Sequence, residues 1–259
     1  MANSAFPVVK GHAMRLTKVG NCALPVREGK NSIVTDGFIS VGITNVMKDA
    51  EDLEQTNAQG EICVADRTAA QLKWHEVTIT MCNVDPEILG FLTANPIVLD
   101  YANKPVGFRS TREVRVDSGA ALELWSGIGG ADCVEPESDD VFESAAVTGG
   151  RSYGYFLLPW IKEAVIGDIE VGASVLNLTI TGITGAPSAW GRGPYNVVEE
   201  SAGVAGRLLT PMSGENHMHV QRTAIAPPKP TDGAVEFEDF PTPYFTDSSA
   251  GGDGEDEAP

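Results

Sequence analysis

The sequence predicts a mostly-β protein with one short helix, and three observations support this fold class. Apolar and polar side chains alternate over residues 73–81, which is the period of a half-buried strand. A signal for the start of a helix follows directly, at residues 85–87. Most of the remaining chain reads as short strands separated by turns. With 259 residues, the chain has room for either one large all-β domain or two small ones.

The strand over residues 73–81 is expected to bury one of its faces. β-branched residues occupy its middle, which favours a strand over a helix. Its inward face carries His75, Val77, Ile79 and Met81. A second strand is predicted over residues 38–47 by the same alternation. Its inward face carries Ile39, Val41 and Ile43.

A short helix is predicted over about residues 85–94, flanking the sheet. Asp85 suits the N-cap, because its carboxylate can accept hydrogen bonds from the free amides of the first turn. Pro86 suits the first helical position, and Glu87 favours the positive end of the helix dipole. The face expected to pack on the sheet carries Ile88, Leu89 and Leu92.

A long hairpin with an acidic tip is predicted over residues 38–65. Residues 62–65 return as a strand, and the segment between the strands, residues 48–60, is polar throughout. This segment is longer than the usual hairpin loop of about two to five residues, so we expect an extended loop. Long loops in compact domains usually carry a function or are disordered. The acidic residues of this loop are Asp49, Glu51, Asp52 and Glu54.

Three weaker predictions concern the rest of the domain. Residues 6–10 and 13–19 are expected to form two short strands split by Gly11-His12. Residues 112–117 alternate charged residues with valine, which is typical of an exposed edge strand. Residues 126–150 are rich in glycine, alanine and acidic residues, so we expect a surface excursion there.

The C-terminal region is predicted to be an acidic, proline-rich arm. The composition changes after residue 226, so the β-domain is expected to span residues 1–226 and the arm residues 227–259. The arm holds nine acidic residues and one basic residue, and it begins with a stiff proline-rich stretch. Apolar anchors between the prolines indicate a segment that docks on a neighbouring chain. The anchors are Val235, Phe237, Phe240, Tyr244 and Phe245.

Charge and motif content argue against nucleic-acid binding and catalysis. The formal net charge is −18, from 36 acidic and 18 basic residues, so the chain should repel phosphate. No catalytic constellation, phosphate-binding loop or dinucleotide-binding turn is recognisable, and we expect no enzyme activity, no cofactor and no metal. His217 and His219, with Glu215 nearby, are the best metal candidates. A pair without a recognisable third ligand favours a polar strand face instead.

The sequence is typical of a chain that folds in a reducing cytoplasm. No apolar run approaches the roughly 18 residues of a membrane helix, and the N-terminus lacks the features of a signal peptide. The four cysteines show no paired spacing. Cys63 and Cys82 fall in apparent strands, so we expect free, buried thiols.

A series of short segments, taken in order along the chain, carries a family resemblance. The segments are Phe38-Ile39-Ser40-Val41, the acidic loop to Gly60, Ile62-Cys63-Val64-Ala65-Asp66, Trp74 to Met81, Val84-Asp85-Pro86-Glu87-Ile88-Leu89, Asn95-Pro96, Val106-Gly107-Phe108, Trp190 to Val198, and His217 to Pro228. Together they resemble the major tail tube proteins of long-tailed bacteriophages, and most closely those of phages that infect actinobacteria. The resemblance spans residues 6–228 and depends on the order of the segments, because no single one is as specific as a metal-ligand signature.

The resemblance implies a β-sandwich or barrel-type tail tube fold with a flanking helix, a long hairpin loop and an extended C-terminal arm. In this family, six copies form a ring, and the rings stack into the tail tube of the virion. Strands from each copy line the channel through which double-stranded DNA leaves the head. Such a tube is assembled in the host bacterial cytoplasm, and no membrane is involved.

The resemblance also implies partners and contact residues. Besides other copies of the chain, the partners are the tail terminator, tape measure and distal tail proteins. DNA passes along an acidic wall without specific binding. Protruding loops and terminal arms bridge the subunits. The candidate inter-subunit contacts are therefore Asp49, Glu51, Asp52, Glu54, Phe237, Phe240, Tyr244 and Phe245.

Two alternatives remain open on the sequence alone. One is another virion β-protein, either a tail terminator or a capsid decoration protein. The other is a carbohydrate-binding or hydrolytic β-sandwich, in which tryptophans line a sugar site, although core packing is the commoner role of tryptophan. The tryptophans are Trp74, Trp125, Trp160 and Trp190.

Overall fold

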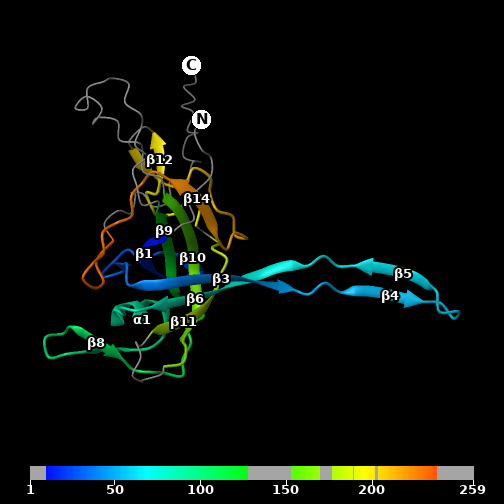
Figure 1. The fold of residues 1–259 in the computed structure, drawn as a ribbon, viewed down its shortest axis with the longest axis horizontal. Helices are drawn as coiled ribbons and strands as arrows, with labels where there is room; N and C mark the ends of the chain where they lie inside the picture. The colour runs from blue at the N-terminus through cyan, green and yellow to red at the C-terminus, as the bar shows by residue number, and fades with distance from the viewer. Residues whose placement is uncertain (1–9, 128–152, 170–176, 189, 202–203, 238–259) are drawn as a thin grey trace, which may run out of the picture.

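The computed structural model describes residues 10–127, 153–169, 177–188, 190–201 and 204–237. Within these residues the fold is mostly β, as the sequence predicted. It comprises an eight-stranded antiparallel sheet, three two-stranded antiparallel sheets and a single short α-helix (Figure 1). Most of the surface excursion predicted over residues 126–150 lies outside the described residues.

The large sheet brings together strands from both halves of the chain. β14 (His219–Thr223) pairs with the first half of β10, and β11 pairs with the second half of the same strand. The order of the other strands is β2 (Ser32–Thr35), β1 (Lys10–Val19), β9 (Gly119–Gly127), β10 (Tyr153–Ile166), β11 (Leu178–Thr184), β6 (Gln71–Met81) and β3 (Phe38–Lys48).

The helix α1 (Pro86–Leu92) begins as the sequence predicted. The Asp85 carboxylate accepts a hydrogen bond from the backbone N–H of Glu87 at 2.9 Å, and Pro86 occupies the first turn. The predicted apolar face is buried, and it packs in one core with residues of β1, β9 and β10. The inward residues predicted for β6 join the same core, apart from the polar His75, which is buried beside it.

The opposite face of the large sheet is covered by loops. Trp125 of β9 and Tyr155 of β10 pack there against Trp190, Tyr195 and other residues between positions 190 and 212. This second core means that the central strands are buried on both faces. Function is therefore expected at the edges and protrusions of the sheet, and not on its central strands.

Several local predictions are corrected by the structure. β1 runs without interruption through Gly11 and His12, because a β-bulge at this point preserves its pairing with β9. Residues 112–117 form no strand. Ile39 is exposed, because a bulge between Phe38 and Ser40 shifts the inward face to Phe38, Val41 and Ile43. The cysteines Cys63 and Cys82 are free but exposed, not buried.

The predicted loop over residues 48–60 contains a further strand, while the predicted strand over residues 62–65 is confirmed. β4 (Asp52–Thr56) pairs with β5 (Ile62–Arg67), and together they prolong the hairpin of β3 and β6 far beyond the body of the protein (Figure 1). Only the turn around residues 57–61 is a loop at the tip. We call residues 49–70 the ribbon.

Two further two-stranded sheets lie outside the large sheet. β7 (Ile97–Leu99) and β8 (Pro105–Phe108) form a hairpin that projects on the side away from the ribbon in the view of Figure 1. β12 (Val198–Ser201) pairs with β13 (Val204–Gly206) among the loops near the second core. A short 3₁₀-helix, η1 (Asn21–Ala23), follows β1.

Candidate interaction surfaces

The ribbon has two chemically different faces. Residues paired across an antiparallel ladder share a face, and faces alternate along each strand. The pairs Leu53–Asp66 and Gln55–Val64 therefore lie on one face of the ribbon. The opposite face carries Asp52, Glu54, Ala65 and Arg67.

Several apolar side chains of the ribbon are exposed to solvent. Leu53 is 56% exposed, Val64 is 52% exposed, and Ile62 near the tip is 59% exposed. At the base of the ribbon, the cross-strand partners Met47 and Leu72 are exposed as well. An isolated two-stranded ribbon is only marginally stable in water, so these side chains require a partner surface for burial.

The acidic residues expected at a subunit contact all lie on this protrusion. Asp49, Glu51, Asp52 and Glu54 are exposed. Asp52 forms an exposed ion pair with Arg67, at 3.4 Å between the side-chain oxygen and nitrogen. Exposed ion pairs contribute little to stability, so this pair alone does not stabilise the ribbon.

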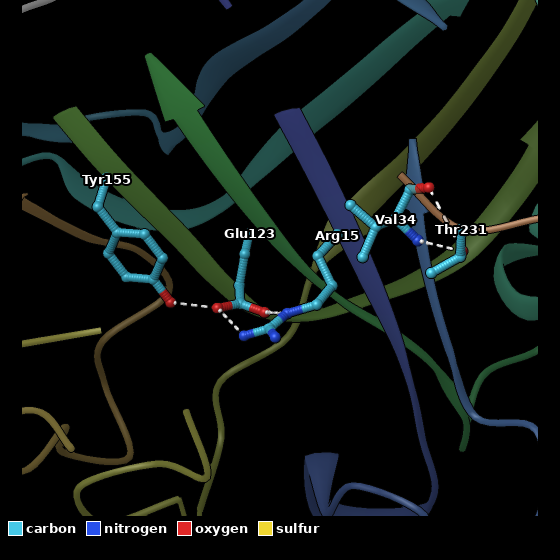
Figure 2. Close-up of polar contacts among 5 residues, drawn as sticks. All are labelled: Arg15, Val34, Glu123, Tyr155 and Thr231. Carbon is cyan, nitrogen blue, oxygen red and sulfur yellow. Dashed lines mark hydrogen bonds and ion pairs between the residues drawn. The ribbon is translucent and has the colours of Figure 1, made fainter. Parts of the chain in front are cut away.

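The two outer edges of the large sheet differ. β3 is the last strand of the sheet, and within the described residues only β6 pairs with it. The outer side of β2 is instead covered by residues 231–237, which we call the strap. Val235 exchanges backbone hydrogen bonds of 2.8–3.0 Å with Ser32, and the Val34 backbone N–H donates to the Thr231 hydroxyl at 3.1 Å (Figure 2).

Phe237 ends the strap inside the second core of its own chain. Its side chain is 7% exposed, and its backbone N–H donates to the Asn31 side chain at 2.8 Å. The sequence placed this residue in an arm at a subunit contact, whereas the structure gives it an intrachain position. Phe240, Tyr244 and Phe245, the other expected contacts, lie outside the described residues.

A buried ion pair holds the second core together. Arg15 of β1 and Glu123 of β9 are cross-strand partners, and their side chains meet in two hydrogen bonds of 2.5 and 2.9 Å (Figure 2). The Tyr155 hydroxyl donates to Glu123 at 2.8 Å. The Arg15 guanidinium also lies 4.8 Å from the ring centres of Tyr195 and Phe237. This pair therefore ties the strap to the central strands.

The environment of this pair shifts two pKa values. Burial alone would lower the pKa of Arg15, but the charge and hydrogen bonds of Glu123 outweigh burial and raise it. Burial and the adjacent Glu123 charge raise the pKa of Tyr155 well above its usual value. Arg15 is therefore charged and Tyr155 neutral throughout the physiological range. The group is structural, since its members are enclosed by the core.

A second polar cluster lies at the base of the ribbon. The His75 ring nitrogen Nδ1 is 2.8 Å from the side-chain oxygen of Asn45, its cross-strand partner. Thr184 of β11 accepts a hydrogen bond from the His75 backbone N–H at 2.9 Å and lies 3.0 Å from Nδ1 of His217. The two histidine rings are 6.1 Å apart.

Both histidines have lowered pKa values. Burial lowers the pKa of His75, and the neighbouring His217 lowers it further. Burial also lowers the pKa of His217, and the hydrogen bond with Thr184 opposes this only in part, while the charge of Lys162 adds to it. His219 is separate from this cluster and lies 3.0 Å from Gln221. Across the described part of the chain, no three potential metal ligands come together.

No protein-family model matches the chain, and no curated protein matches it. Among the described residues, no helix has the length and apolar character needed to cross a membrane.

Proposed function

We propose that this chain is a structural virion protein that assembles with copies of itself into stacked hexameric rings. These rings form the tail tube through which a long-tailed bacteriophage ejects its DNA. The resemblance of residues 6–228 to major tail tube proteins suggests the six-fold ring and the DNA channel. The geometry of the chain independently favours self-association.

The ribbon is the observation that carries this proposal. It projects from the body, exposes Leu53, Ile62 and Val64, and has no covering segment among the described residues. A monomeric protein gains nothing from an exposed, partly apolar two-stranded protrusion, and such surfaces usually mark interaction sites. The ribbon is therefore best explained as a contact element between subunits.

The open edge of β3 supports the same conclusion. An exposed edge strand presents unpaired backbone groups that can pair with a strand of another chain. The strap covers the opposite edge, so within the described residues the large sheet is closed on one side and open on the other. The net charge of −18 suits a conduit, because acidic walls repel the DNA backbone and allow the duplex to slide.

The carbohydrate-binding alternative finds less support. Trp125 and Trp190 are buried in the second core, where their rings pack against Tyr155 and Tyr195. Rings enclosed in this way cannot stack on a sugar. A tail terminator or capsid decoration protein is a different outcome of the experiment below, because it would form rings that do not stack.

The test is negative-stain electron microscopy of the purified protein over a range of concentrations, with analytical ultracentrifugation in parallel. We expect six-fold rings, and tubes of stacked rings at higher concentration. Particles that stay monomeric at every concentration would contradict the proposal. Rings that never stack would favour a terminator or decoration protein, and protection of the tryptophans by glycans would favour a sugar-binding role.

A further inference from the structure

We infer that the ribbon of one copy docks on the β7–β8 hairpin and the loop that follows it, residues 99–116, in the next copy. This inference rests on the proposed function, since it names the surface that receives the ribbon. We call residues 99–116 the receiving surface. The argument depends on charge, on exposed apolar side chains and on the placement of the two surfaces.

The receiving surface is basic in a strongly acidic chain. Residues 99–116 contain four basic and two acidic residues, a net charge of +2, whereas the whole chain has a net charge of −18. Lys104, Arg109 and Arg112 are exposed, and none of them joins an ion pair formed within the described residues. These three cations are thus available to a partner of opposite charge.

The ribbon supplies that opposite charge. The ribbon contains six acidic residues and one basic residue, Arg67, which is already paired with Asp52. Complementary charges across an interface select the correct partner and its orientation. Two acidic surfaces would repel each other, so most of the remaining surface is a poorer match for the ribbon.

The receiving surface also exposes apolar side chains. Tyr101 at the hairpin tip is fully exposed, and Leu99, Val106, Val114 and Val116 are each exposed by 44% or more. Arg115 fixes the loop by donating a hydrogen bond to the backbone oxygen of Gly90 in α1, at 3.0 Å. The loop therefore offers a fixed apolar and basic surface to the ribbon face that carries Asp52, Glu54 and, at the tip, the exposed Ile62.

The placement of the two surfaces requires a second copy. The ribbon and the β7–β8 hairpin project from opposite sides of the body in the view of Figure 1, so one chain cannot bring them together. A contact between unlike surfaces of identical chains is head-to-tail, and it repeats from copy to copy. Such a contact produces closed rings or extended stacks, which are the assemblies that the proposed function requires.

Charge reversal tests the inference. We expect Arg109→Glu with Arg112→Glu to raise the concentration needed for assembly by about tenfold or more, because like charges then face each other. Asp52→Arg with Glu54→Arg on the ribbon should have the same effect. A chain carrying all four substitutions should assemble again, and so should an equimolar mixture of the two double variants. Sedimentation measures assembly, and circular dichroism confirms that each variant is folded.

Arg27→Glu with Lys30→Glu is the matched control, because it reverses two exposed basic residues outside the receiving surface. It should assemble like the wild type. If the wild type assembles and the reversal at Arg109 and Arg112 has no effect, or the four-fold variant is not rescued, the inference fails while the proposed function stands. If the wild type does not assemble, both fail. If the reversal abolishes only retention of duplex DNA, the surface binds nucleic acid and the inference is overturned.

Discussion

Arg15 and Glu123 face each other across neighbouring strands, 108 positions apart in the sequence, and both are buried. Each side chain has further partners, the Tyr155 hydroxyl for the carboxylate and three aromatic rings for the guanidinium. Breaking a buried pair leaves an uncompensated charge in the core, which is more costly than the loss of the contact itself.

We predict that Glu123→Gln lowers the free energy of unfolding by about 3–5 kcal/mol, because Arg15 then lacks its counter-charge. Chemical denaturation measures this change. Asp52→Asn is the matched control, since it removes a carboxylate from an exposed ion pair and should cost less than about 1 kcal/mol. Equal effects of the two substitutions would show that the buried pair does not support the fold.

The strap gives a second prediction. Phe237→Ala should lower the free energy of unfolding by about 3–5 kcal/mol, because it leaves a cavity beside Arg15 and Tyr195. Val235→Ala, two residues earlier on the strap and half-exposed, should have a much smaller effect. Denaturation of the two variants, with limited proteolysis of the strap, makes the comparison. A similar loss for both would mean that Phe237 does not anchor the strap.

The histidine cluster predicts a pH dependence. The folded-state pKa values of His75 and His217 are lowered, so the unfolded state binds more protons once the pH falls below about 6.5. The stability contributed by the neutral histidines is therefore present above that pH and is lost as the pH falls through the lowered folded-state pKa values. Denaturation midpoints measured between about pH 7 and pH 5 should decrease.

His217→Gln should flatten this decrease, because it removes one titrating ring and the positive neighbour of His75. The matched control is His12→Gln, which replaces an exposed histidine outside the cluster and should keep the wild-type dependence. The same slope in all three proteins would exclude the cluster as its origin.

The parts of the fold that the sequence predicted are those with local causes. β6 is recognisable from its alternation, and α1 from the cap formed by Asp85 and Pro86, since these signals lie within a few neighbouring residues. β4 was missed because its polar sequence resembles a loop, and its strand conformation depends on pairing with β5. The acidic composition of the ribbon was nevertheless predicted from the sequence.

The contacts that organise the second core have no local signal. Arg15, Glu123 and Tyr155 meet only after three strands have aligned, and none of them stands in a recognisable motif. Phe237 looked like an anchor for another chain, because an aromatic residue among prolines and acids is typical of a docking segment. Its position in the second core depends on Asn31 and Arg15, which the sequence separates from it by more than 200 residues.

The late position of the strap has a consequence for folding during synthesis. β1 and β2 leave the ribosome early, but the residue that closes over them is Phe237, which follows Asn31 by 206 positions. Contacts of such long range form slowly, and partly folded chains with open strand edges are prone to aggregate. Until the strap has been synthesised, the outer edge of β2 therefore stays uncovered. Synthesis of the strap then distinguishes this edge from that of β3, which no described residue covers.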